Sequence, residues 1–208
     1  KNMNYFDILI FARRNIEHAK IPSTVKHIYP YSFYKCLNLQ TIEILENSDK
    51  ISIKQSAFAD SSIETLIIKS NQFEFERDWC SSTSNLNKIV LSQNNKDYFY
   101  KDEEFILSKT DKTKDEFDVL LFARRDIKHA IIPSYIKVIA DSAFGNCEAL
   151  KSIDFSNDSK LTEICAFSFN CSSIESIIIP SHVKIIGTTS FNFCQKLKKI
   201  EFSENSEL

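Results

Sequence analysis

The feature that most constrains the fold of this chain is a short internal repeat. Five phenylalanines each follow a serine or an alanine and stand five residues after an isoleucine, at spacings of 25, 25 and 22 residues between neighbours. Each is followed by an apolar residue, two mostly polar residues and an apolar-x-apolar triplet. A sixth, degenerate copy ends in Leu86–Leu91, and Trp79 is its candidate anchor. The five anchor phenylalanines are Phe33, Phe58, Phe144, Phe169 and Phe191.

The triplet that ends each repeat predicts a short β-strand. Alternation places Ile42 and Ile44 on one face of such a strand and Glu43 on the other. A single coil cannot bury that apolar face, whereas stacked coils can pair their strands in parallel at about 4.8 Å. The L-x-x-L-x-L spacing and the period are those of a leucine-rich repeat. The predicted fold is therefore a right-handed leucine-rich-repeat solenoid with short parallel β-strands stacked along its concave face.

A second apolar pattern precedes the anchors and predicts the return leg of each coil. Three of its four copies follow Ile-Pro-Ser. Proline suits a corner where a strand ends, because it lacks the backbone donor that a central ladder needs. We therefore expect an irregular or short extended convex side. The copies are Val25–Ile28, Ile136–Ile139, Leu161–Ile164 and Val183–Ile186.

A longer repeat, with an offset of 111 residues, relates Phe6–Pro22 to Phe117–Pro133. Between the repeat blocks a charged stretch separates Phe105–Leu107 from Val119–Phe122, which predicts a β-hairpin insertion with a solvated turn. Because stacked repeats contact their neighbours continuously, one elongated solenoid over residues 1–208 is expected. Its predicted parts are the second arm of a hairpin (1–12), a first repeat block (13–91), a polar segment with the hairpin insertion (92–123) and a second repeat block (124–208).

Composition excludes several classes of function. With Gly145 and Gly187 as the only glycines, neither a dinucleotide-binding G-x-G-x-x-G nor a P-loop can exist, so no cofactor is expected. The scarcity of glycine also predicts few residues with positive φ. A net charge of −2 argues against a dominant electrostatic attraction to nucleic acid or an anionic membrane. No apolar run reaches the roughly 18 residues of a transmembrane helix.

The cysteines and histidines lack the spacing of a metal site. The six cysteines contain no C-x-x-C and the four histidines no H-E-x-x-H. Cys165 and Cys171 could form a disulfide in an oxidising compartment, and Cys80 remains a candidate for a reactive or paired thiol. Three other cysteines stand three residues after an anchor, where leucine-rich repeats bury a small side chain, and are expected to be free and buried. These are Cys36, Cys147 and Cys194.

Repeat placement also bears on two other groups of residues. His18 and His129 occupy the same place in the long repeat, which favours a role in the scaffold over a role as ligands. The doublets Arg13-Arg14 and Arg124-Arg125 could clamp a phosphate or a glycosaminoglycan. Their equivalent positions favour a structural or solvated role instead.

The outward side chains of the stacked strands are the predicted binding surface, because solenoids bind partners through such a sheet. Ile67, Val90 and Ile178 are apolar, which a purely solvated face does not require. Cross-strand apolar pairing that stabilises the sheet is the alternative explanation. The predicted partner-binding set is Glu43, Ile67, Val90, Asp154, Ile178, Glu201, Thr41, Thr65, Lys88, Ser152, Ser176 and Lys199.

The repeat unit resembles that of BspA-like leucine-rich-repeat proteins. It reads Ile-Pro-Ser-x-Val-Lys-x-Ile, then small-Phe, then Cys, then Leu-x-x-Ile, most clearly in Ile132–Phe155 and Ile179–Phe202, and the resemblance covers nearly the entire chain. The hairpin before Ala-Arg-Arg resembles an insertion in members from parasitic protists, and the scarcity of glycine also favours a protist-type member. The resemblance implies a surface-exposed protein that mediates attachment to host cells, extracellular-matrix proteins or other microbes.

Two functions from different classes follow. The first is a non-enzymatic, extracellular adhesion module that binds a protein or glycoprotein on host cells or matrix, without inserting into a membrane. The alternative is an intracellular scaffold for protein–protein interaction. Reduced cysteines and unglycosylated Asn157 and Asn170 would favour the scaffold. Self-association through the exposed apolar strand positions is a further expectation, and an enzyme is the least favoured class.

Overall fold

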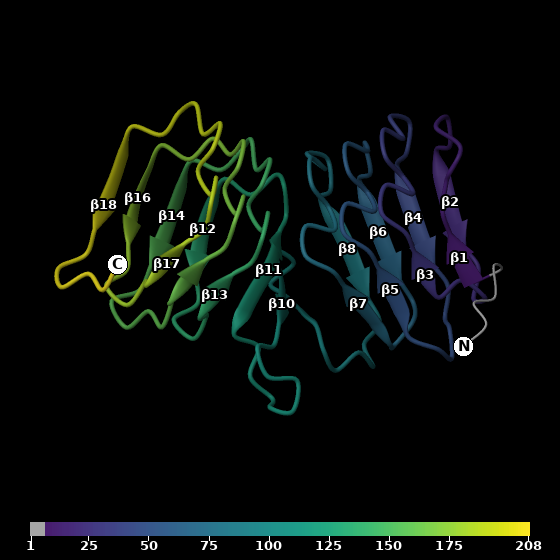
Figure 1. The fold of residues 1–208 in the computed structure, drawn as a ribbon, viewed down its shortest axis with the longest axis horizontal. Helices are drawn as coiled ribbons and strands as arrows, with labels where there is room; N and C mark the ends of the chain where they lie inside the picture. The colour runs from purple at the N-terminus through teal and green to yellow at the C-terminus, as the bar shows by residue number, and fades with distance from the viewer. Residues whose placement is uncertain (1–6) are drawn as a thin grey trace. The chain divides into compact units, whose positions relative to one another are not determined.

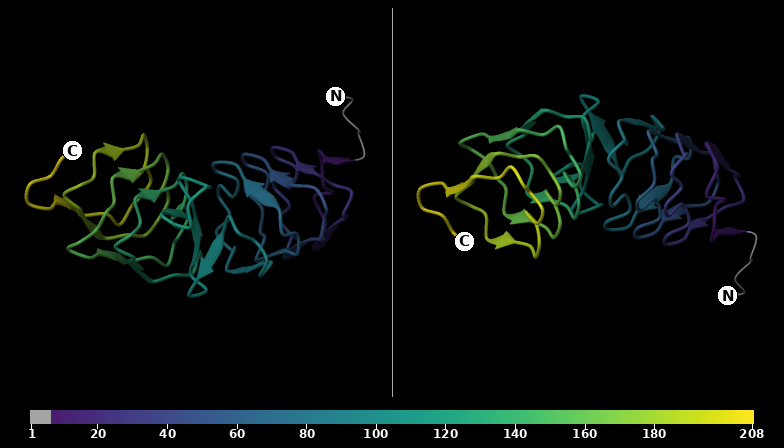
Figure 2. Two further views of the ribbon diagram at one scale, coloured as in Figure 1. Left: turned by 90° about the horizontal axis from the view of Figure 1, so that it is seen from below. Right: turned by 90° about the horizontal axis from the view of Figure 1, so that it is seen from above.

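The computed structural model of this protein describes residues 7–208, which form eighteen strands. Within that range there is no α-helix, and hence none with the length and apolar character needed to cross a membrane. The chain forms two compact units, Lys1–Lys96 and Asp97–Leu208. Figure 1 labels most of the strands, and Figure 2 shows them from two further sides.

In the first unit, successive coils add strands to two parallel sheets. The repeat strands carry the apolar-x-apolar triplets and pair in register, so that Ile42 lies opposite Leu66. The return strand at His27–Ile28 lies in the predicted return leg Val25–Ile28, whereas the return strands at Ile51–Ile53 and Phe73–Phe75 were not predicted. The repeat strands are β2 (His18–Ile21), β4 (Thr41–Ile44), β6 (Thr65–Ile68) and β8 (Lys88–Leu91). The return strands are β1 (Ile8–Leu9), β3 (His27–Ile28), β5 (Ile51–Ile53) and β7 (Phe73–Phe75).

The second unit repeats this arrangement and adds the hairpin. Its repeat strands pair as β12 with β14 and β16 with β18, and β14 lies next to β16. They are β12 (His129–Ile132), β14 (Ser152–Phe155), β16 (Ser176–Ile179) and β18 (Lys199–Phe202). The other sheet, in the order β17-β15-β13-β11-β10-β9, contains β17 (Ile185–Ile186), β15 (Glu163–Ile164), β13 (Val138–Ile139), β11 (Val119–Ala123), β10 (Phe105–Ser108) and β9 (Phe99–Lys101). The predicted solenoid of short parallel strands is confirmed.

The predicted hairpin is formed by β10 and β11, which pair antiparallel, and its turn over residues 110–116 is exposed. Strand β9, which the sequence pattern did not predict, pairs antiparallel with β10. Strand β11 also pairs in parallel with β13, so the hairpin is built into the return sheet. In the same way β1 pairs in parallel with β3. Residues 1–6 of the hairpin arm predicted at 1–12 lie outside the described residues.

The core of each unit contains a ladder of anchor rings. In the second unit the rings of Phe144 and Phe169 stack with centroids 5.0 Å apart, and Phe105 of the hairpin lies 6.2 Å from Phe144. In the first unit Phe33 and Phe58 meet edge to face at 5.6 Å. Full burial of such a side chain stabilises the fold by about 1.5–3 kcal/mol, and an aromatic pair adds about 0.5–1.5 kcal/mol. The hairpin is therefore joined to the core as well as to the return sheet.

Each anchor sits in a tight turn with two left-handed residues, one two positions before it and one two positions after it. The expectation of few residues with positive φ is therefore wrong: fifteen of the described residues have positive φ, and none of them is glycine. Around Phe33, the amides of Tyr31, Phe33 and Lys35 each donate to a carbonyl of the next coil, at 3.2, 2.9 and 3.2 Å. These bonds offset the cost of left-handed backbone, about 1–2 kcal/mol per residue.

The left-handed pairs also locate the anchor of the degenerate repeat. In that turn the pair flanks Cys80, so Cys80 and not Trp79 holds the anchor position. Trp79 takes the place of the small residue, and its carbonyl accepts a hydrogen bond from the Phe58 amide at 3.2 Å. The Trp79 side chain is 1% exposed and lies edge to face with Phe58 at 5.8 Å. The indole therefore fills the space that an anchor phenylalanine occupies elsewhere.

Alanine usually gives a more stable protein than glycine at the same position. At Lys35, whose φ is 53°, the left-handed backbone should reverse this order. A Lys35→Gly variant should be more stable than Lys35→Ala by about 1 kcal/mol, because only glycine adopts this φ without strain from Cβ. Urea unfolding of both variants measures the difference. A Lys35→Ala protein as stable as Lys35→Gly would contradict the left-handed conformation at this position.

Gly187 is required by close packing between coils. A Cβ added there would lie 2.5 Å from the amide nitrogen of Ala166 in the neighbouring coil, whereas at Gly145 the nearest atom, the Ser142 carbonyl oxygen, is 3.2 Å away. Gly187→Ala should therefore destabilise the second unit by about 2 kcal/mol or more, as overpacking does. Gly145→Ala is the matched control and should lower the stability of the second unit by less. Thermal unfolding compares them, and equal losses would refute the close approach.

Candidate binding surface

The candidate site is the outer face of the repeat strands, formed by the two side chains of each strand that point away from the core. In the first unit the strand registers align these side chains in two rows across β2, β4, β6 and β8. All of the residues predicted from this unit lie in those rows. The first row is His18, Thr41, Thr65 and Lys88, and the second row is Lys20, Glu43, Ile67 and Val90.

The second row of the first unit divides into a charged part and an apolar part. The Glu43 carboxylate lies 2.5 Å from Lys69 Nζ and 3.9 Å from Lys20 Nζ. The hydrogen bond from Lys69 is the main cause that lowers the pKa of Glu43. Ile67 and Val90 lie opposite each other in register, as cross-strand apolar pairing requires.

The outer face of the second unit has a different chemistry. The partner in register with Ile131 is Asp154, and the partner of Ile178 is Glu201. Ile131 is 66% exposed and Ile178 is 55% exposed. Pairing with another apolar side chain in register does not explain these isoleucines. The predicted Ser152, Ser176 and Lys199 lie with His129 in the first row of this face.

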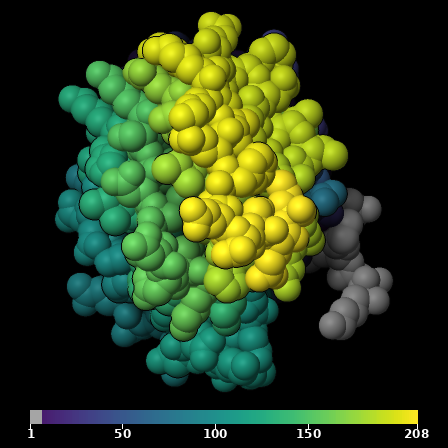
Figure 3. Space-filling view, turned by 90° about the vertical axis from the view of Figure 1, so that its left-hand side faces the viewer, coloured from purple at the N-terminus to yellow at the C-terminus, as the bar shows by residue number. Residues whose placement is uncertain are grey.

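A hollow of about 520 Å³ borders this face beyond the ends of β14, β16 and β18. Asp154 and Ile178 line it together with Phe155, Pro180 and Glu204. Figure 3 shows this end of the second unit in space-filling form, with the last coil in yellow nearest the viewer. The hollow gives the outer face a concave border where acidic and apolar groups meet.

His129 lies between two polar neighbours on the outer face and not inside the scaffold. Its Nδ1 is 2.7 Å from Ser152 Oγ, and its Nε2 is 3.4 Å from Asp154 Oδ2. Within residues 7–208, no cluster of three or more His, Cys, Asp or Glu side chains is arranged to hold a metal ion.

Sequence reasoning missed the outer-face residues of the first strand in each block. The signal was present, because Ile16-Glu-His-Ala19-Lys-Ile21 has the same spacing as the other repeats. Alanine at the first inward position, in place of isoleucine or leucine, hid it. Ala19 is nevertheless buried beside Ile42 in register. The missed residues are His18, Lys20, His129 and Ile131.

None of the six cysteines forms a disulfide in the structure, and two of the three predicted buried thiols are confirmed. Cys36 and Cys147 are fully buried, and the Cys147 thiol donates to the Arg124 carbonyl at 3.8 Å. Burial raises the pKa of Cys147. Cys194 is only partly buried, because within residues 7–208 no following coil covers it. Burial also raises the pKa of Cys165, to about 12, so its thiol is protonated at neutral pH.

The second arginine of each doublet is structural. Arg125 is 2% exposed, and its Nη1 donates to the Ala143 carbonyl at 2.9 Å and to Cys147 Sγ at 3.7 Å. Its guanidinium also lies 4.4 Å from the centre of the Phe122 ring. Arg14 makes the equivalent hydrogen bond to the Ser32 carbonyl at 3.2 Å. The structural alternative is therefore confirmed for both residues.

Asp118 fixes the base of the hairpin turn. Its side chain is 4% exposed and accepts hydrogen bonds from the Thr110 amide at 2.8 Å, the Thr110 hydroxyl at 2.7 Å and Lys137 Nζ at 2.9 Å. Burial by itself would raise the pKa of Asp118, but the hydrogen bonds from Thr110 and Lys137 outweigh it, so the pKa is lowered. Asp7 and Lys26 form the equivalent ion pair of the first unit at 3.9 Å.

The fold and its outer face define a leucine-rich-repeat β-solenoid. The family model of the BspA type leucine rich repeat region matches six copies, over residues 6–106 and 116–208. Because the match covers most of the sequence, the chain belongs to the BspA-type leucine-rich-repeat family. No curated protein sequence matches it.

Three solved structures share this fold. A leucine-rich repeat protein from Eubacterium ventriosum aligns at 19% identity and a TM-score of 0.64, over 90% of this chain and 60% of its own. A leucine rich cell surface protein from Faecalibacterium prausnitzii aligns at 17% and 0.60, over 90% and 60%. The pneumococcal vaccine antigen PcpA aligns at 19% and 0.68, over 92% and 52%. This chain thus spans 52% to 60% of the lengths of the structures it matches.

The depressed pKa of Asp118 predicts a pH dependence of stability. Its contribution should be fully present above the unfolded pKa, about 3.9, and lost as the pH falls through the lower folded pKa. Asp118→Asn should therefore lower the free energy of unfolding by about 1.5–3 kcal/mol at pH 7. Below about pH 4 the free energies of unfolding of the variant and the wild type should come closer together. Urea unfolding across this range tests it. Asp115→Asn, at a side chain that is 94% exposed, is the control and should change little.

Proposed function

We propose that this chain is a non-enzymatic binding module displayed at a cell surface, and that its outer strand face recognises a protein or glycoprotein of a host cell, a matrix or another microbe. The observation that carries the proposal is the second row of the second unit. There the exposed Ile131 and Ile178 stand beside Asp154 and Glu201 in register. Apolar side chains that the fold leaves in water, next to charges, are typical of recognition surfaces.

The family supports this proposal. Solenoids of stacked repeats present extended sheets to partners, and the matched family consists of such repeats. A structural neighbour from Faecalibacterium prausnitzii is described as a cell surface protein, and another is the pneumococcal vaccine antigen PcpA. Display outside the cell is carried to this chain from those descriptions as part of the proposal. Self-association through the same exposed isoleucines is a second use of the face.

The test is binding of the purified chain to epithelial cells and to immobilised matrix proteins. Ile178→Lys and Asp154→Lys should each weaken saturable binding by about tenfold or more. Each substitution places a positive charge at a position of the proposed contact that is apolar or acidic in the wild type. Ile185→Lys is the matched control. Ile185 is 52% exposed, close to the 55% of Ile178, but it lies on return strand β17.

Circular dichroism and thermal unfolding establish that each variant is folded. Binding that is lost with Ile178→Lys and kept with Ile185→Lys supports the outer face as the site of contact. Equal loss with both variants would place the contact elsewhere. If the folded wild-type chain binds neither cells nor matrix, the adhesion proposal fails and the intracellular scaffold becomes the better explanation.

A further inference from the structure

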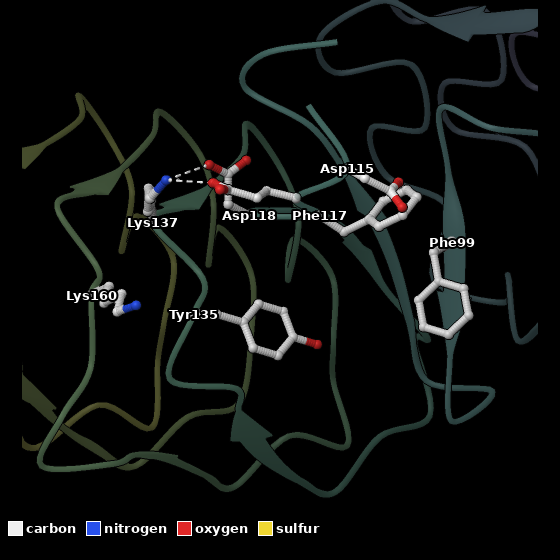
Figure 4. A pocket seen from close by; sticks show the side chains of 8 residues that line it. Phe99, Asp115, Phe117, Asp118, Tyr135, Lys137 and Lys160 are labelled. Carbon is white, nitrogen blue, oxygen red and sulfur yellow. Dashed lines mark hydrogen bonds and ion pairs between the residues drawn. The ribbon is translucent and has the colours of Figure 1, made fainter. Parts of the chain in front are cut away.

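A pocket of about 420 Å³ lies in the second unit, where the hairpin meets the corner that precedes β13. Its apolar walls are the rings of Phe99, Phe117 and Tyr135. Figure 4 shows the Tyr135 ring between Phe99 on one side and Lys160 on the other, with the tyrosine hydroxyl directed toward Phe99. Phe99 is 50% exposed and Tyr135 is 42% exposed, so both rings present surface to a ligand.

The hairpin side of the pocket holds an aromatic pair and three carboxylates, which share only two lysines, Lys109 and Lys137. Phe99 and Phe117 lie with ring centroids 5.8 Å apart, and the Lys109 ammonium lies 4.5 Å from the centre of the Phe117 ring. Lys109 also pairs with Asp115 at 3.0 Å. A cation therefore already occupies the Phe117 face, which leaves no place there for a cationic ligand.

The opposite side of the pocket carries the positive charges of Lys137 and Lys160. Lys137 pairs with Asp118 at 2.9 Å and with Glu116 at 3.4 Å, and Figure 4 draws these contacts as dashed lines. Lys160 also lines the pocket; among residues 7–208 no salt bridge holds its ammonium, although its charge helps to lower the pKa of Asp158. The pocket thus combines an aromatic cleft with one ammonium that is outside any salt bridge, on the side away from the hairpin carboxylates.

A second hollow, of about 670 Å³, adjoins this pocket at Tyr135, which lines both. Its wall includes Ile131 and His129 of strand β12, so the hollow leads from the pocket to the outer strand face. Each hollow by itself has the size of a small-molecule site, and the two together offer room for several consecutive residues of an extended chain.

Taking the proposed protein-binding function as its basis, we propose that this pocket binds a short extended segment of a partner protein, which inserts a large apolar side chain between Phe99 and Tyr135 and places a neighbouring Asp or Glu carboxylate on Lys160. The orientation follows from the charges, because the hairpin carboxylates repel an acidic group on their own side. The aromatic rings provide most of the contact area, and Lys160 selects for the acidic neighbour.

The test uses a random dodecapeptide library displayed on phage and selected on the folded chain of residues 1–208. Selected peptides are expected to carry a large apolar residue within about two positions of Asp or Glu, the reach of adjacent side chains on an extended segment. Synthetic copies should bind Tyr135→Ser and Lys160→Glu about tenfold more weakly than the wild type. Selection on Lys160→Glu should replace the acidic residue with Lys or Arg.

Tyr31→Ser and Lys128→Glu are matched controls, because both replace exposed side chains outside the pocket, and both should keep full affinity. Absence of enriched peptides, enrichment of basic instead of acidic neighbours on the wild type, or unchanged binding to Tyr135→Ser would each overturn the proposal. The Ile178→Lys variant tests the outer face separately from the pocket. Peptide binding that survives Ile178→Lys supports the pocket even if cell binding fails, and the two proposals can therefore fail independently.

Discussion

The structure depends on backbone hydrogen bonds that run from each coil to the next. They are made in the repeat strands, in the return strands and through the anchor turns. Because one coil has no core of its own, its conformation is set by the positions of its neighbours' amides and carbonyls. This constraint explains why residues such as Tyr31 and Lys35 hold left-handed backbone without being glycine. It also explains why Gly187 is needed although its φ is ordinary, since there the neighbouring backbone passes too close for a Cβ.

Polar side chains that look functional in the sequence serve this stacking. Arg125 is buried and donates to a carbonyl of the following coil, where it meets the free thiol of Cys147. Asp118 holds the hairpin turn through Thr110 and joins it to the next coil through Lys137. A buried charge is stable only when it is hydrogen-bonded or paired. These residues are therefore committed to the scaffold, and the chemistry available to a partner is confined to the surface.

The surface carries two adjoining features with different recognition chemistry. On the outer face of the second unit, Ile131 and Ile178 lie in register with acidic partners and remain exposed. Beside it, Tyr135 and Lys160 line a pocket against the hairpin. None of these four side chains takes part in the ladder of backbone hydrogen bonds. Their identities can therefore change recognition without disturbing the stacking of coils, which is how a repeat scaffold separates stability from specificity.

The sequence by itself determined the repeat, the inward strand positions, the hairpin pair β10–β11 and the burial of Cys36 and Cys147. These features follow from a two-residue alternation and from the length of a coil, which are local properties of the chain. It also placed the twelve predicted outer-face residues on the correct side of their strands. Only the tertiary structure decided the anchor position of Cys80, the left-handed turns without glycine and strand β9. It alone brought Phe99, Tyr135 and Lys160 together. These features depend on which backbone and side-chain groups of different coils meet, and no spacing within a single repeat encodes that.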